Sequence, residues 1–160
     1  MTNENQHDSS LASLFSEEIN EGLKQRFGYK RRCADFDPTG DTIHAKAKKM
    51  DIYLRFPANF RRWHEMSETL VVARIGFAEQ RKGHGTWLLE LLSRLAPKYG
   101  YKSIAIESTN HKESIQNFVR KFGFEAFPEG DTSQSNWIIS INDLNAELLL
   151  LEEKASIPSA

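Results

Sequence analysis

The chain of 160 residues carries 21 Lys and Arg against 22 Asp and Glu, so a formal net charge of −1 singles out neither nucleic acid nor membrane as a partner. One domain of this length can bury a core without disulfides or a structural metal. The lone Cys33 excludes an internal disulfide framework, and no Cys/His cluster has metal-ligand spacing. With no apolar run long enough to cross a bilayer and a polar start unlike a signal peptide, the sequence predicts a soluble cytoplasmic protein.

Charge is nevertheless uneven along the chain. Residues 24–62 hold 11 Lys and Arg against 4 Asp and Glu, whereas residues 125–160 hold 1 basic against 7 acidic residues. A basic half is compatible with a phosphorylated ligand or with nucleic acid, and also with solvated faces that balance each other across one fold. We favour the second interpretation.

The first expected element is a helix that begins at Ser9 or Ser10 and ends before Gly28, because apolar residues recur on one helical face. These residues are Leu11, Leu14, Phe15, Ile19 and Leu23. Residues 1–8 are expected to form a disordered N-terminus, and residues 9–143 to form the domain.

Residues 29–66 give a mixed pattern. The stretches KRRCADF, TIHAKAK and DIYLRF are compatible with strands, DPTG with a turn, and ANFRRWHEM with a short helix. The sequence alone leaves the secondary structure of this region open.

The second half predicts alternating strands and helices. Residues 69–77, TLVVARIGF, are typical of a central strand covered on both faces, and the leucine-rich helix that follows must end or kink near Pro97. Next come the strand KSIAIES, a helix that stops at Gly123, and the strands FEAF and NWIISI, separated by the turn-rich PEGDTSQS. This order predicts an α/β or layered α+β fold, followed by a C-terminal helix and tail over residues 144–160.

A glycine loop joins the expected central strand to its helix. A tight turn on Gly83 and Gly85 would leave unpaired backbone N–H groups at the positive end of the helix dipole, where an anion can approach closely. Gln80, Arg81 and Lys82 would add donors and positive charge. By composition alone, however, such a loop is more often an ordinary turn.

Residues 80–85, Gln-Arg-Lys-Gly-His-Gly, resemble the Q/R-x-x-G-x-G/A pyrophosphate loop of the GCN5-related N-acetyltransferase (GNAT) superfamily, which uses acetyl-CoA. The surrounding elements follow the family's order, with an L-x-V-x-x-x-N strand and a helix ending in K-x-G-F downstream of the loop. Their counterparts here are Ile104, Ile106, Asn110 and residues 121–124. The resemblance covers residues 69–141.

The resemblance implies a mixed, mostly antiparallel sheet with a splayed central strand. In the family, free N–H groups of that strand hold the pantetheine arm and polarise the thioester carbonyl, and the loop backbone binds the pyrophosphate. Carried over, the implied cofactor-binding residues are Ala73, Arg74, Ile75, Gln80, Arg81, Lys82, Gly83, His84, Gly85, Thr86, Asn110 and Lys121.

The implied reaction is direct transfer of an acetyl group from acetyl-CoA, the co-substrate, to a primary amine, with no metal. A lysine-like amine has a pKa of about 10.4, so a carboxylate or a water chain must take its proton. The family's glutamate base falls on Thr69, and Glu68 beside it points to the opposite face of an extended strand. Glu107, His64 and Glu65 are further candidates; Glu68, Thr69 and Glu107 are carried forward as catalytic.

A second departure concerns the general acid. Many relatives place a tyrosine four residues before the glycine of the G-F pair, and here that position is Val119. A thiol pKa of about 8.5 makes the leaving group tolerable without that acid. The partners expected are acetyl-CoA and an unidentified amine, with no membrane; homodimers are common in the family. Two alternatives stay open: an acyl-CoA-binding regulatory or interaction module without turnover, and an aminoacyl-tRNA or other nucleic-acid-associated acetyltransferase suggested by residues 24–62.

Overall fold

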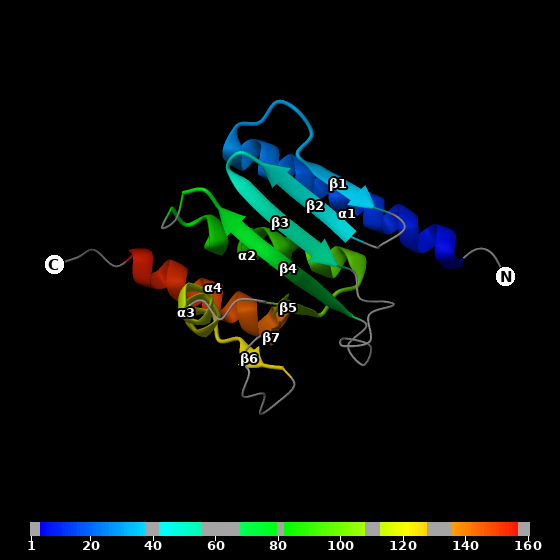
Figure 1. The fold of residues 1–160 in the computed structure, drawn as a ribbon. Helices are drawn as coiled ribbons and strands as arrows, with labels where there is room; N and C mark the ends of the chain where they lie inside the picture. Colours follow the sequence, from blue (N-terminus) through cyan, green and yellow to red (C-terminus); the bar gives the residue numbers. More distant parts are fainter. Residues whose placement is uncertain are drawn as a thin grey trace.

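Short segments with alternating apolar residues build one sheet. The computed structural model describes residues 4–37, 42–55, 68–79, 82–107, 113–127 and 136–156, the side chains of residues 4–10 excepted. The strands are β1 Ala34–Asp37, β2 Thr42–Ala47, β3 Met50–Arg55, β4 Thr69–Phe77, β5 Ser103–Glu107, β6 Glu125–Ala126 and β7 Asn136–Ser140. Their order in the sheet is β1-β2-β3-β4-β5-β7-β6, and only β4 and β5 pair in parallel. The expected mixed, mostly antiparallel sheet is confirmed (Figure 1).

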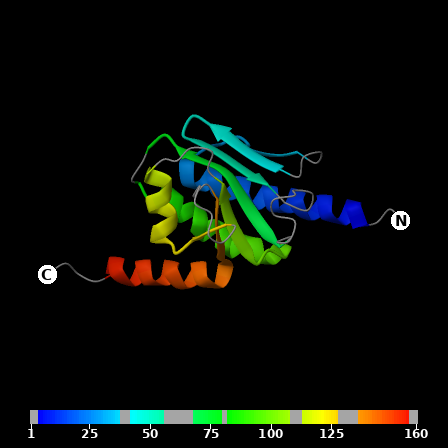
Figure 2. The ribbon, with the colours of Figure 1, turned by 60° about the horizontal axis from the view of Figure 1, so that its bottom comes forward.

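Amphipathic helices cover one face of this sheet. They are α1 Glu4–Phe27, α2 His84–Leu95, α3 Glu113–Lys121 and α4 Ile141–Ser156, and a 3₁₀ turn, η3 Ala96–Tyr99, follows α2. Apolar side chains from all four helices join one buried cluster with those of the strands. The blue α1, the green α2 and the red α4 lie on the same side of the strands in Figure 2. Fully burying one of the large aliphatic or aromatic side chains stabilises the fold by about 1.5–3 kcal/mol.

Helix α1 crosses α2 closely because one residue at the crossing, Gly22, is small. The Cβ atom that an alanine would add at Gly22 of α1 would lie 3.0 Å from Leu91 Cδ2 of α2. Glycine therefore lets the two helices approach closely at this crossing. On either side of it, Phe15, Ile19 and Leu23 of α1 are fully buried.

Most predicted elements are confirmed, and the region between residues 34 and 55, which the sequence left open, forms three strands. The predicted helix start at Ser9 or Ser10 is wrong, because α1 begins at Glu4. Acidic residues are favourable in a first helical turn, where they face the positive end of the dipole, and neither glycine nor proline interrupts residues 4–9. The expected turns DPTG and PEGDTSQS and the expected helix ANFRRWHEM lie at least partly outside the described residues. The division at residues 8 and 143 stays a prediction.

Pro97 acts as expected, because α2 ends at Leu95 and the chain tightens into η3. Gly100 then takes a positive φ of 88° and closes the turn with bonds to the carbonyls of Ala96 and Pro97. None of the described helices is long and apolar enough to cross a membrane.

Candidate cofactor-binding site

The described pairing of β4 with β5 ends partway along β4, and this place is called the fork. The parallel pairing covers Thr69 to Val72 of β4 and ends, within the described residues, at Val72 opposite Ile106. Strand β4 continues to Phe77 and stays paired with β3 on its other side. The edge of β4 beyond Val72 that faces away from β3 therefore offers backbone groups to a ligand.

A β-bulge marks the start of this fork. Tyr53 of β3 pairs with Arg74, whereas the next residue, Leu54, pairs with Val72, which leaves Ala73 as the extra residue of β4. A bulge bends its strand and increases the local twist. Here it lies at the level where the described pairing of β4 with β5 ends.

Beyond the fork, β4 leads into the glycine loop and α2. Gly83 is the N-cap of α2 with a φ of 75°, in the left-handed region that glycine adopts at no steric cost, and no side chain caps the helix among the described residues. The first helical bond runs from Trp87 N to Gly83 O at 2.9 Å. The N–H groups of His84, Gly85 and Thr86 precede that bond and have no acceptor within the helix.

The chain thus combines a forked parallel strand pair with a left-handed glycine cap at the next helix. This is the arrangement that the resemblance to the GNAT superfamily implied. The end of the described pairing between β4 and β5 is compatible with the splayed central strand that the resemblance implied.

Several solved structures of GNAT proteins are similar to this chain. One is FdhC, a nucleotide-linked sugar GNAT, with 13% identity and a TM-score of 0.49 over 90% of this chain and 89% of that chain. A GNAT acetyltransferase from Staphylococcus aureus Mu50 has 16% identity and a TM-score of 0.45 over 82% and 94%. Another from Elizabethkingia anophelis, with acetyl-CoA bound, has 18% identity and a TM-score of 0.41 over 78% and 82%. No family model and no curated protein matches the sequence.

The two loop glycines have different structural causes. Among the described residues, no atom beyond the chain neighbours lies within 4 Å of a Cβ built at Gly83, and its positive φ favours glycine there. A Cβ at Gly85 would lie 2.6 Å from Phe118 Cε2 of α3. Gly85 is therefore also a packing residue, at the place where α3 contacts the start of α2.

His84 is held between aromatic rings and cations. Its ring centroid lies 4.8 Å from that of Phe27 and 5.3 Å from that of Phe77. Partial burial lowers the pKa of His84, and the charges of Arg26 and Lys82 lower it further, while Glu79 acts in the opposite direction. A neutral imidazole is thus favoured beside the loop.

The expected backbone contacts at Ala73, Arg74 and Ile75 fall on the forked part of β4. Ile75 packs against the main core, whereas the exposed side chain of Arg74 extends to the other face of the sheet. There Arg74 Nη1 lies 3.3 Å from Asp51 Oδ2, and Asp51 Oδ1 lies 3.1 Å from His44 Nε2. Because the Arg74 side chain is bound to Asp51 of β3, the cofactor contact expected at Arg74 is one of its backbone N–H group.

Two of the three candidate catalytic residues lie at the start of β4. Thr69 is only 2% exposed and pairs with Ser103. Glu68 precedes it, with a side chain that is 55% exposed and an Oε2 atom 3.0 Å from Lys102 Nζ. At about 3.3 Å per residue, the start of β4 lies roughly 13 Å along the strand from Ala73.

The third candidate, Glu107, lies at the fork. It follows Ile106, the last residue of β5 that pairs with β4, and is therefore level with Ala73. Its side chain is 10% exposed, and its Oε2 atom accepts a hydrogen bond from Arg55 Nη1 at 2.8 Å. The structure brings this carboxylate, rather than that of Glu68, to the place where the two strands part.

Several predicted site residues lie outside the described residues, namely Gln80, Arg81, Asn110, His64 and Glu65. Lys121 is described, and its Nζ atom lies 5.4 Å from the centroid of the Phe122 ring. Val119, at the position of the missing tyrosine, is buried in the core. Within the described ranges, no three His, Cys, Asp or Glu side chains gather as metal ligands would.

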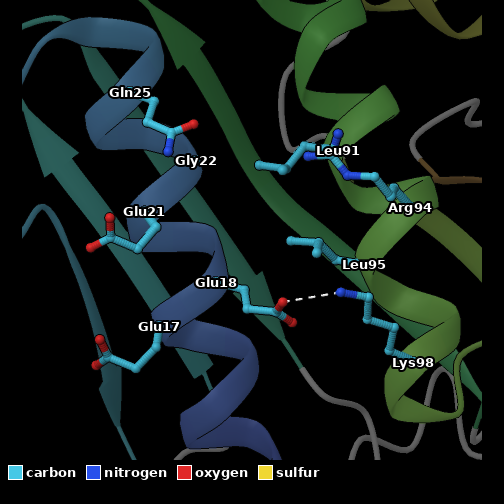
Figure 3. A pocket seen from close by; sticks show the side chains of 9 residues that line it. All are labelled: Glu17, Glu18, Glu21, Gly22, Gln25, Leu91, Arg94, Leu95 and Lys98. Atoms are coloured by element: carbon cyan, nitrogen blue, oxygen red, sulfur yellow. Dashed lines mark hydrogen bonds and ion pairs between the residues drawn. The ribbon is translucent and has the colours of Figure 1, made fainter.

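A cavity lies between α1 and the C-terminal half of α2, apart from the glycine loop (Figure 3). This cavity of about 440 Å³ has acidic side chains on its α1 wall and Arg94 and Lys98 on the other. Glu18 and Lys98 form an ion pair across it at 3.1 Å. The charges of its walls oppose each other, and it lies at the far end of α2 from the glycine loop.

Sequence reasoning missed two arginines that contact candidate site residues. Arg26 of α1 contacts the loop, and Arg55 of β3 pairs with Glu107. Their partners lie 56 and 52 residues away in the chain. The surplus of basic residues over 24–62 was the one signal in the sequence that included both.

Proposed function

We propose that this chain is an N-acetyltransferase that moves an acetyl group from acetyl-CoA directly to a primary amine. The observation that carries the proposal is the continuous run of main chain from the bulge at Ala73 to the left-handed cap at Gly83. It begins at a strand edge without a described β5 partner and ends at a helix N-terminus without a described cap. A thioester joined to a diphosphate requires donors of these two kinds, at its two ends.

Each end of this path has a separate task. The amides of His84, Gly85 and Thr86 face an anion at the positive end of α2 and would hold the diphosphate. The forked part of β4 would orient the acyl end, and its fixed N–H groups would stabilise negative charge on the carbonyl oxygen as the amine attacks. When bound, acetyl-CoA supplies the activated acyl group.

Glu107 is the residue we assign to accept the proton of the amine. Its carboxylate lies at the level where the fork opens, and general bases act within hydrogen-bond reach or through one water. The ion pair with Arg55, at 2.8 Å, holds its side chain in place. Glu68 is exposed, bound to Lys102 and remote from the fork, which makes it the weaker candidate.

The leaving thiolate needs no acid from this chain. Val119 cannot donate a proton and is buried, so nothing in the described part of α3 takes the role of the family tyrosine at that position. An ordinary thiol pKa of about 8.5 lets the thiolate depart and take its proton from water.

The experiment that tests the proposal has two steps. Isothermal titration calorimetry with acetyl-CoA should show binding, and a thiol-release assay with a panel of small amines, peptides and aminoacyl-tRNA should show turnover with at least one acceptor. Failure to bind acetyl-CoA overturns the proposal. Binding without release of CoA across that panel supports instead a regulatory acyl-CoA-binding module, which the buried Val119 favours.

Three basic residues of the 24–62 segment, which suggested a nucleic-acid partner, are engaged in ion pairs within the fold. Lys24, Arg32 and Arg55 are paired with Glu21, Glu17 and Glu107, respectively. Cations engaged in this way neutralise fewer phosphates than their number suggests. The same panel tests this alternative through its aminoacyl-tRNA arm.

A further inference from the structure

One arginine of α1 makes three contacts with the glycine loop and the start of α2. Arg26 Nη2 donates to the carbonyl oxygen of Lys82 at 3.2 Å. Its Nε donates to Nδ1 of His84 at 3.3 Å, and its guanidinium carbon lies 5.5 Å from the centroid of the Trp87 ring. The planar fork of an arginine can satisfy a carbonyl and a ring nitrogen at once, whereas the ammonium of lysine is a single point.

The neighbours of Arg26 hold the same part of the chain. Phe27 packs edge-on against Trp87 and beside His84. The carbonyl of Phe27 in turn accepts a hydrogen bond from Lys49 Nζ at 3.2 Å, and Lys49 O accepts one from Ala78 N at 2.9 Å, just after β4. The end of α1 and the β2–β3 turn therefore support the loop from one side.

The contact with Lys82 determines a direction in the loop backbone. In a trans peptide the carbonyl of one residue and the N–H of the next lie in one plane and point in opposite directions. Fixing the Lys82 carbonyl toward Arg26 therefore aims the N–H of Gly83 to the opposite side. Without such an anchor, a peptide next to a glycine has many orientations. Ligand binding must then fix one of them, and the lost conformational entropy weakens the affinity.

We propose that Arg26 is a positioning residue for the glycine loop, which preorganises the loop amides for a diphosphate by holding the Lys82 carbonyl and the His84 ring. The ligand part of this inference rests on the proposed function. A second consequence does not: a guanidinium only donates, so His84 Nδ1 must accept and the ring proton resides on Nε2.

The binding test compares Arg26→Ala and Arg26→Lys with Arg94→Ala, a control arginine at the far end of α2. We expect Arg26→Ala to raise the Kd for acetyl-CoA and its KM about tenfold, with kcat at saturation within about twofold of wild type. Arg26→Lys should not restore the affinity, and Arg94→Ala should bind as wild type does. Wild-type affinity in Arg26→Ala, full rescue by lysine, or an equal loss in Arg94→Ala overturns the proposal.

The tautomer test uses the free protein, so it is independent of any ligand. Nitrogen-15 NMR of the imidazole at pH 7.5 should show His84 in the Nε2–H form in the wild type. In Arg26→Ala the Nδ1 signal should shift toward that of a histidine exchanging between tautomers. A His84 spectrum that is the same in Arg26→Ala as in the wild type overturns the positioning role of Arg26, even if acetyl-CoA binds. If the wild type binds no acetyl-CoA, the proposed function fails and this spectrum alone decides the role of Arg26.

Discussion

Gly83 and Glu107 illustrate how single positions carry the proposed chemistry. Gly83 provides backbone conformation and open space, because its φ is 75° and nothing lies within 4 Å of a Cβ built there. Glu107 provides charge, at a place where its carboxylate is largely enclosed and bound to Arg55. One position therefore tests anion binding, and the other tests proton removal.

Replacing Gly83 by aspartate should abolish binding of acetyl-CoA. Aspartate tolerates the left-handed region better than most residues, so α2 should still form, but its charge faces the bound diphosphate. We expect at least about a hundredfold weaker binding by calorimetry, which is roughly 2.7 kcal/mol.

Gly83→Asn is the matched control, because asparagine has the same shape and conformational tolerance without the charge. It should retain much more affinity than the aspartate variant. Equal affinities for acetyl-CoA in the two variants would contradict a phosphate site at this loop.

Glu107→Gln should lower kcat by about 10²–10⁴-fold, the usual contribution of a general base, while the Kd for acetyl-CoA stays near the wild-type value. Glu68→Gln serves as the comparison, since Glu68 is exposed and remote from the fork. Steady-state kinetics with the best amine of the panel gives both values, and circular dichroism checks folding. A loss of kcat confined to Glu68→Gln would assign the base to Glu68 instead.

Helices α2 and α3 are in close contact at Gly85, where the ring of Phe118 leaves no room for a side chain. Gly85 lies in the first turn of α2 and faces the ring of Phe118. The Phe118 ring also packs edge-on against Phe122, with ring centroids 5.0 Å apart. The second glycine of the loop motif thus has a packing role in this chain, besides any role in binding. A substitution there tests the contact between the two helices.

Gly85→Ala should destabilise the protein by about 1–3 kcal/mol, the usual cost of overpacking, despite the better helix propensity of alanine. The added Cβ would lie 2.6 Å from Phe118 Cε2, so the ring must move. The measurement is urea denaturation of Gly85→Ala, Phe118→Leu and the double variant. Because leucine removes the clashing atom, the alanine should cost less in the Phe118→Leu background; strict additivity would show that the two residues do not interact.

Long-range contacts in the middle and at the C-terminal end of α1 join distant parts of the domain. The C-terminal end carries Arg26 and Phe27 to the loop, while Glu18 bonds to Lys98 and Tyr99 of η3. Phe15 stacks on Tyr99 with ring centroids 4.6 Å apart. Helix α1 therefore connects the region after α2 with the region before it.

The bond between Tyr99 and Glu18 should make stability depend on pH. The hydrogen bond from Tyr99, followed by that from Lys98, lowers the pKa of Glu18 below its ordinary value of 4.5. Burial and the bond to Glu18 raise the pKa of Tyr99 from 10.0 to about 12. The folded state is thus stabilised between these limits, and the contribution is lost as pH falls through the folded pKa of Glu18 or rises from 10 through about 12.

Tyr99→Phe should accordingly reduce the free energy of unfolding by about 1 kcal/mol at pH 7, a modest value because the Glu18 side chain is 38% exposed. Urea denaturation of both proteins should give a constant difference from pH 6 to 9 and a smaller one at pH 3. A difference that persists unchanged at pH 3 would show that the effect of removing the Tyr99 hydroxyl does not depend on an ionised Glu18.

Elements with strong local signals could be predicted from the sequence. The run TLVVARIGF is strand β4. The leucine spacing after Gly85 and the break at Pro97 correspond to α2, and the stop at Gly123 corresponds to the end of α3. Strands β1 to β3 were ambiguous because their outward faces carry charged residues such as Lys46 and Asp51. In those strands the pairing partner, rather than the local pattern, decides the conformation.

The sequence by itself determined that a buried strand turns through a glycine loop into an amphipathic helix, since propensity, periodicity and the need for a positive φ all act within a few residues. Folding in three dimensions decided that β4 bulges at Ala73 and parts from β5, that Glu107 rather than Glu68 lies at the fork, and that Arg26 holds the loop. These features depend on contacts between residues tens of positions apart, and local pattern contains no information about which distant side chain will arrive.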